Sequence, residues 1–91
     1  MRGMDADELT RRDAEISKGL QPLLDDMYAA IDEKAAVEVR SELIEKGEAK
    51  LALYDKLLAD LQGAQREQTE RRYKSFVAEL QGFLPQLKES P

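Results

Sequence analysis

Apolar side chains recur at alternating spacings of three and four residues between positions 37 and 61, and this repeat constrains the fold more than any other feature. Such a repeat places its members on one face of an α-helix, so it predicts a helix over 35–62 with a broad apolar face. Leu43 and Leu57 widen that face, and Arg40 is the one charged residue that interrupts it. The members of the repeat are Val37, Ile44, Gly47, Leu51, Tyr54, Leu58 and Leu61.

Gly47 allows two interpretations within this segment. Together with Lys46 it resembles the C-cap of a helix that ends there. Its place in the repeat instead indicates a small core residue that lets a second helix approach closely. The repeat is the stronger signal, so we expect one continuous helix.

Two helices are predicted before this segment. Asp5, followed by acidic residues, resembles the N-cap of a helix over 5–18. Gly19 followed by Pro22 is a helix-stop signal, which favours a break or a sharp kink before a second helix over 22–34. One kinked helix stays open as the alternative, because a 4-3-4-3 apolar spacing continues across the proline. The residues that keep this spacing are Ile16, Leu20, Leu23, Met27 and Ala30.

A turn and a last helix are predicted after the repeat. Gly63 marks the turn, and the helix is expected over 64–81, where Gly82 and Pro85 interrupt its pattern. The apolar tail that follows, residues 83–87, is expected to dock on the chain's own helices, with insertion into a partner as the alternative.

These elements define a single all-α domain over residues 1–91, with residues 1–4 and 88–91 predicted to be disordered. Short connections favour an antiparallel helical bundle or a long helical hairpin of three to four helices. A chain of 91 residues buries only a modest share of its surface. Dimerisation could therefore complete the core.

The amino-acid inventory excludes several kinds of chemistry. The chain has no His and no Cys, which removes the commonest general base and the usual zinc ligands. A Ser–Lys pair stays formally open at Ser17, Ser41 or Ser75, but these serines lie in ordinary polar helical contexts. We therefore predict no enzymatic activity, no catalytic residue and no cofactor.

Acidic residues offer one candidate metal site. Glu38, Glu42 and Glu45 share a helical face, and oxygen ligands of this kind bind hard cations such as Mg²⁺. A solvated acidic face is the favoured interpretation, so no metal is predicted. The net charge of −5 also disfavours direct binding to nucleic acid or to an anionic membrane. Without an apolar run of membrane-spanning length, we expect a soluble, cytoplasmic protein.

A basic segment follows the predicted turn. Arg66, Arg71, Arg72 and Lys74 lie beside Tyr73 and Phe76, a combination that can bind single-stranded nucleic acid. Helical spacing favours an inward-facing aromatic stripe with its charges paired, Glu67 with Arg71 and Glu70 with Lys74. The same segment also fits the rim of a protein-binding surface.

The sequence therefore predicts a non-enzymatic protein–protein interaction module, such as a helical adaptor, small chaperone or assembly factor. Its partner is expected to be a protein: a second copy of the chain, a partner helix, or both. The alternative is an acidic regulator that occludes a basic site on a nucleic-acid-binding protein. The predicted partner-binding residues are Leu51, Tyr54, Leu58, Leu61, Tyr73, Phe76, Phe83 and Leu84.

Overall fold

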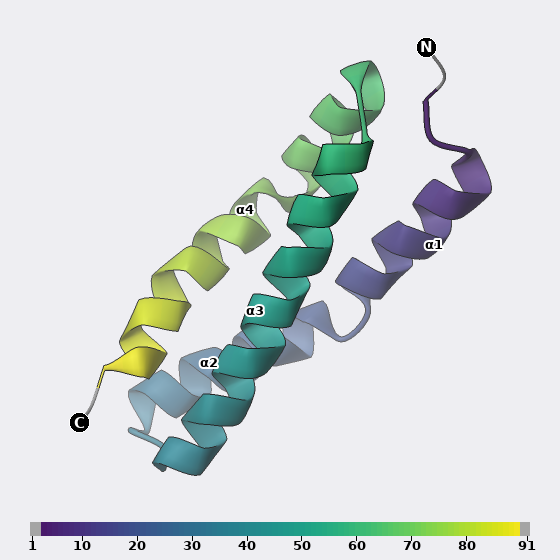
Figure 1. The fold of residues 1–91 in the computed structure, drawn as a ribbon. Coiled ribbons are helices and arrows are strands. Elements are labelled where there is room, and N and C mark those ends of the chain that lie inside the picture. Colours follow the sequence, from purple (N-terminus) through teal and green to yellow (C-terminus); the bar gives the residue numbers. More distant parts are fainter. Residues whose placement is uncertain (1–2, 90–91) are drawn as a thin grey trace.

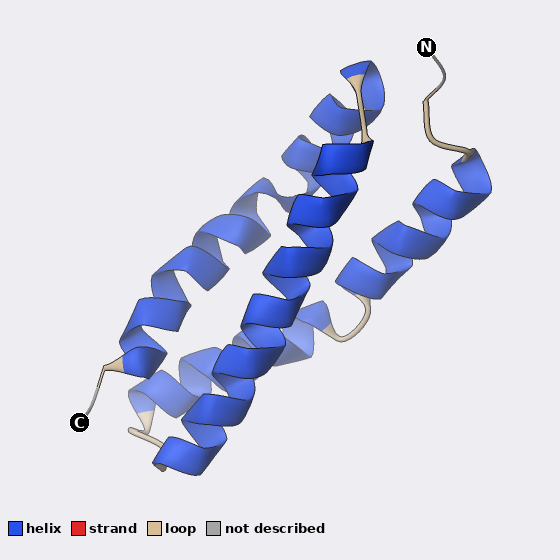
Figure 2. Ribbon diagram, in the orientation of Figure 1, coloured by secondary structure: helices blue, strands red, loops and turns tan. Residues whose placement is uncertain are grey.

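The computed structural model describes residues 3–89, and this part of the chain contains four helices and no strand (Figures 1 and 2). The all-α prediction is confirmed. The helices are α1 (Ala6–Ser17), α2 (Leu20–Asp32), α3 (Val37–Asp60) and α4 (Gly63–Lys88).

The helices form an elongated molecule of 50 × 18 × 16 Å. α3 and α4 run antiparallel and side by side, and α1 and α2 follow one another as a bent arm along them (Figure 1). α2 packs on both α3 and α4, whereas α1 packs mainly on α3. The core therefore lies along the line where the arm meets the α3–α4 hairpin.

The break between α1 and α2 is confirmed at Gly19. Its φ of +69° is left-handed, a conformation that glycine adopts without steric cost. α2 begins at Leu20, two residues before the predicted start, which places Pro22 in the first helical turn. A proline is tolerated there because the first amide groups of a helix have no intrahelical acceptor.

The buried side of α3 differs in part from the predicted face. Two lines of residues point inward. One has a spacing of seven and runs from Arg40 through Gly47 and Tyr54 to Leu61; the other consists of Leu43 and Leu57, which are fourteen residues apart. The first line belongs to the predicted repeat, and the second was expected only to widen it. The third line, Val37, Ile44, Leu51 and Leu58, is half-buried at best, with Val37 63% exposed.

α3 and α4 meet in layers separated by two helical turns. Arg40 contacts Leu87, Gly47 lies against Leu80, and the rings of Tyr54 and Tyr73 meet edge to face at 5.8 Å between centroids. Moving seven residues toward the C-terminus of α3 therefore corresponds to moving seven residues toward the N-terminus of α4. This constant register is the geometry of an antiparallel coiled-coil pair.

α3 continues through Gly47, so the continuous-helix interpretation is confirmed, and Gly47 lies in a closely packed layer. A Cβ at this position would lie 2.8 Å from Met27 Cε, 3.2 Å from Leu84 Cδ2 and 3.3 Å from Leu80 Cδ2. The absence of a side chain is what allows α2 and α4 to close on α3 at this level.

Substituting leucine for glycine is expected to have opposite effects at two helical positions. Gly47→Leu should lower the free energy of unfolding by about 3 kcal/mol, because overpacking forces three helices apart. A Cβ at Gly82 would meet no atom within 4 Å, so Gly82→Leu should raise the free energy of unfolding by up to about 1 kcal/mol through helix propensity. Urea denaturation measures both, and equal effects would contradict the close-packed layer.

α4 extends beyond its predicted end near residue 81, and that boundary was wrong. The helix continues through Pro85 to Lys88, and the apolar tail docks as expected, with Leu84 and Leu87 buried. A proline inside a helix costs roughly 3 kcal/mol. Burial of the two leucines offsets this cost, since each contributes roughly 1.5–3 kcal/mol.

Two cations of α3 cap the C-terminal ends of neighbouring helices. Arg40 donates from Nε to the carbonyl of Leu87 at 3.1 Å and from its terminal nitrogen to the carbonyl of Glu89. Lys50 donates from Nζ to the carbonyls of Glu15 and Lys18, at 2.6 and 2.8 Å. Each satisfies carbonyls that a helix end leaves free and places a positive charge at the negative end of the helix dipole.

The described ends of the chain are more ordered than predicted. Met4 is partly buried, and its backbone exchanges two hydrogen bonds of 2.9 Å with the side-chain amide of Gln65. Lys88 closes α4 and pairs with Glu48 at 3.0 Å. The predicted disorder of residues 1–2 and 90–91 lies outside the described residues.

Candidate interaction surfaces

Most of the predicted partner-binding residues lie in the core of the chain itself. The aromatic residues among them form one row: Tyr54 packs on Tyr73, and Tyr73 packs on Phe76. Phe83 is half-buried and meets Tyr28 edge to face at 6.5 Å. Five of the eight are buried, namely Tyr54, Leu61, Tyr73, Phe76 and Leu84, and only Leu51, Leu58 and Phe83 remain partly exposed.

A polar cluster fixes α1 to α4 beside this aromatic row. Arg72 donates to both carboxylate oxygens of Asp13 at 2.9 and 3.0 Å, and the Tyr73 hydroxyl hydrogen-bonds to the same carboxylate. Tyr73 is 3% exposed, whereas Arg72 is largely exposed. The cluster explains why Tyr73 is tolerated in the core, because a buried hydroxyl requires a partner. No local pattern in the sequence indicates that Asp13 is that partner.

This cluster makes stability sensitive to alkaline pH. Burial, and then the hydrogen bond to Asp13, raise the pKa of Tyr73. An unfolded tyrosine titrates near pH 10. The unfolded chain therefore loses this proton first, and the associated stability, fully present below about pH 10, is lost as pH rises through the folded pKa. Tyr73→Phe should flatten the decline of the unfolding free energy above pH 10. Urea titrations at a series of pH values test this, and an unchanged slope would contradict it.

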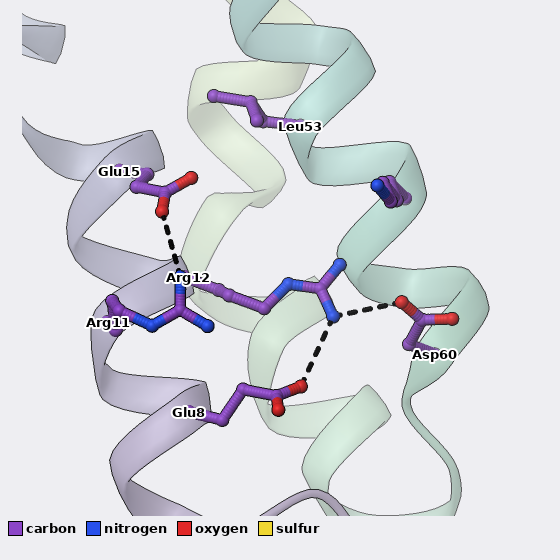
Figure 3. Close-up of a pocket in the computed structure, with 7 residues that line it drawn as sticks. Glu8, Arg11, Arg12, Glu15, Leu53 and Asp60 are labelled. Atoms are coloured by element: carbon purple, nitrogen blue, oxygen red, sulfur yellow. Dashed lines mark hydrogen bonds and ion pairs between the residues drawn. The ribbon is translucent and has the colours of Figure 1, made fainter.

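The groove between α1 and α3 is closed by charged side chains (Figure 3). Arg12 reaches across it from α1 and pairs with Asp60 of α3 at 2.9 Å and with Glu8 at 3.6 Å. Arg11 pairs with Glu15 on the outer side of α1 at 3.4 Å. Leu53 lines the groove on α3. Lys56 of α3 also lines the groove and, unlike the other charged residues there, forms no ion pair among the described residues.

A second surface lies on the side of the α3–α4 hairpin that faces away from α1. Tyr54 of α3 and Val77 and Ala78 of α4 line a groove between the two helices. Leu51 and Leu58 flank Tyr54 at three and four residues along α3, positions that share its face. Ile44 continues their line one heptad earlier. We call this set of residues, Ile44, Leu51, Tyr54, Leu58, Val77 and Ala78, the outer α3–α4 face.

Charges border the outer α3–α4 face on both helices. Glu48 and Asp55 flank the leucines on α3, whereas Arg71 and Lys74 line the groove on α4 together with one carboxylate, that of Glu70. Burial raises the pKa of Tyr54, and the carboxylates of Glu70 and Asp55 raise it further. Arg71 was predicted to pair with Glu67, and Lys74 with Glu70, but neither ion pair forms. Glu70 pairs instead with Arg66, at 3.9 Å.

The end of the molecule that holds the connection between α2 and α3 is acidic. Residues 25–48 contain eight carboxylates and three cations, a net charge of −5 that equals the charge of the whole chain. The same end carries Tyr28, Val37 and Val39, the large apolar residues that are most exposed. Glu38, Glu42 and Glu45 all point to solvent there, and Glu42 pairs with Lys46 at 3.1 Å.

Within residues 3–89, no group of three or more carboxylates is arranged to hold a metal ion. None of the helices in this range combines the length and the apolar composition that a membrane crossing requires. Compared with protein-family models, with curated proteins and with solved structures, the chain matches none. The surfaces themselves are therefore the basis for a functional proposal.

Proposed function

We propose that the protein is a non-enzymatic interaction module whose outer α3–α4 face binds a helical surface of another polypeptide. One observation carries the proposal. Ile44, Leu51 and Leu58 recur at the heptad spacing of core residues, yet they lie at the side of α3, where no helix of this chain covers them fully. Regularly spaced leucines on a half-exposed helix face are typical of a seam that a further helix completes.

The total accessible surface supports this proposal. The chain exposes 6260 Å², whereas a compact monomer of 10.3 kDa is expected to expose roughly 5,400 Å². The excess follows from the elongated shape, which leaves long helix faces in contact with water. Association along such a face removes apolar area and gains about 25 cal/mol for each Å².

The lack of His and Cys supports a non-enzymatic role, because the residue types behind most acid–base and nucleophilic catalysis are missing. The acidic regulator remains the second candidate. It is favoured by the concentration of the whole net charge at the end that also exposes Val37 and Val39. A basic, partly apolar surface would complement that end.

Affinity capture from host extract distinguishes these candidates when it uses four tagged baits, the native chain and three variants. Leu51→Gln combined with Leu58→Gln should lose the polypeptides that the native chain retains. The matched control Leu53→Gln changes a half-buried leucine that faces α1, and it should retain them. Loss only with the third variant, in which Glu38, Glu42 and Glu45 are all changed to lysine, would favour the acidic regulator.

Helicity measured by circular dichroism must be equal for all baits, so that a lost partner reports on the surface rather than on folding. Quantitative mass spectrometry of the retained polypeptides provides the readout, and a second copy of the chain counts among them. Equal retention by the native chain and by the Leu51/Leu58 variant would exclude the outer α3–α4 face as the binding surface.

A further inference from the structure

We infer that the outer α3–α4 face binds a second copy of this chain, related by a two-fold axis that runs parallel to α3 and α4. This inference rests on the proposed function and names its partner. A two-fold interface uses the same patch on both copies, so the patch must complement itself in both its apolar and its charged parts.

The apolar part of the face fulfils this requirement. Leu51 and Leu58 lie beside the groove, and Val77 lines it together with the small residue Ala78 of α4. Ala78 leaves space beside Val77, so a leucine of one copy can enter this gap in the other. Helices with small residues at their contact approach to about 8 Å.

The charged part selects one orientation. A two-fold axis parallel to the helices places α3 of each copy opposite α4 of the other and keeps every residue at its height along the molecule. Because Tyr54 and Tyr73 face each other in one layer, Asp55 lies at the height of Arg71 and Lys74. Asp55 of each copy therefore meets these two cations of the other. A perpendicular axis would instead place acidic α3 on acidic α3.

The charges concerned are available for this contact. Among the residues that the structure describes, Asp55, Arg71 and Lys74 form no ion pair within the chain, whereas Glu48 is already paired with Lys88.

Sedimentation equilibrium of the full chain tests the inference first. The native protein should show a reversible monomer–dimer equilibrium. Leu51→Gln combined with Leu58→Gln should raise the dissociation constant about a hundredfold, and Leu53→Gln should leave it unchanged. Circular dichroism must show that all three remain helical.

Charge reversal in separate chains tests the orientation. One chain carries Asp55→Lys, and the other carries Arg71→Glu with Lys74→Glu. Each alone should dimerise at least about tenfold more weakly than the native chain, because like charges then face each other. An equimolar mixture should recover native-like dimerisation, since the heterodimer restores opposite charges at both contacts. The chain with all three changes also pairs opposite charges and should dimerise like the native chain.

The outcomes separate this inference from the proposed function. The native chain could stay monomeric at millimolar concentration while its retention of host polypeptides still depends on Leu51 and Leu58. This result would overturn the inference that the partner is a second copy, but the proposed interaction module would stand. A dimer whose dissociation constant is unchanged by both the leucine and the charge substitutions would show that the assigned face is wrong. A mixture that associates no better than its components would overturn the two-fold orientation.

Discussion

Leu57→Asp is expected to unfold the chain, whereas Leu58→Asp is expected to leave it folded. Leu57 is 1% exposed, so the substitution places a carboxylate in the core without a cation to pair with. Burial of an unpaired charge combined with the loss of a leucine costs more than about 5 kcal/mol. A domain of this size has a total stability of only about 5–13 kcal/mol.

At Leu58 the same aspartate reaches water, because this side chain lies at the edge of the outer α3–α4 face. The expected loss is about 1–2 kcal/mol, a fraction of the transfer free energy of a fully buried leucine. Thermal melts followed by circular dichroism compare the two neighbours directly. If Leu58→Asp proved the more damaging change, the register of α3 described above would be wrong by one residue.

Arg40→Met is expected to destabilise the protein by about 2–3 kcal/mol, the typical worth of hydrogen bonds to a charged donor. The guanidinium is 8% exposed and binds the carbonyls of Leu87 and Glu89. Methionine fills similar space but donates no hydrogen bond, so the last turn of α4 loses its cap. Pro85 already weakens this turn, since it donates no amide hydrogen to the helix.

Hydrogen exchange at the amides of residues 86–88 provides the local readout, and urea denaturation gives the global one. Arg40→Lys is the matched control, because it keeps the charge but lacks the planar fork that reaches two carbonyls. Arg40→Lys should lower the free energy of unfolding by less than Arg40→Met does. Equal or greater stability of Arg40→Met would show that the cap contributes nothing.

The helices and the breaks between them could be predicted from the sequence because local signals decide them. Gly19 and Gly63 interrupt the pattern where the chain adopts positive φ, and the place of Gly47 in the repeat correctly indicated close helix approach. These features depend on the conformational range of a single residue and on periodicity, both of which are visible without the fold.

The features that could not be predicted depend on residues far apart in the chain. Arg40 looked like a defect in an apolar stripe, and only the position of the end of α4 shows why a cation belongs there. Local rules predict that the helix ends before Pro85, but tertiary burial of Leu84 and Leu87 outweighs the local effect of the proline. The roles of Leu57 and Leu58 also depend on where α1 and α2 pack around α3.

The same limit applies to the candidate site. Helical spacing identified Leu51 and Leu58 together with residues that proved to be core, because a repeat does not distinguish a seam filled by the chain from one left for another copy. Val77 stood beside the predicted stripe, and the basic segment was expected either to pair internally or to border a protein surface. The structure places Arg71 and Lys74 at the groove.

Intermolecular contacts at Leu51 and Leu58 can be observed directly by isotope-filtered NMR on a mixture of labelled and unlabelled chains. Binding of a second copy to the outer α3–α4 face predicts nuclear Overhauser effects from the methyl groups of these leucines to Val77 of the other chain, with none from Leu53. A sample that contains dimers but shows no intermolecular effect at these methyl groups would contradict it.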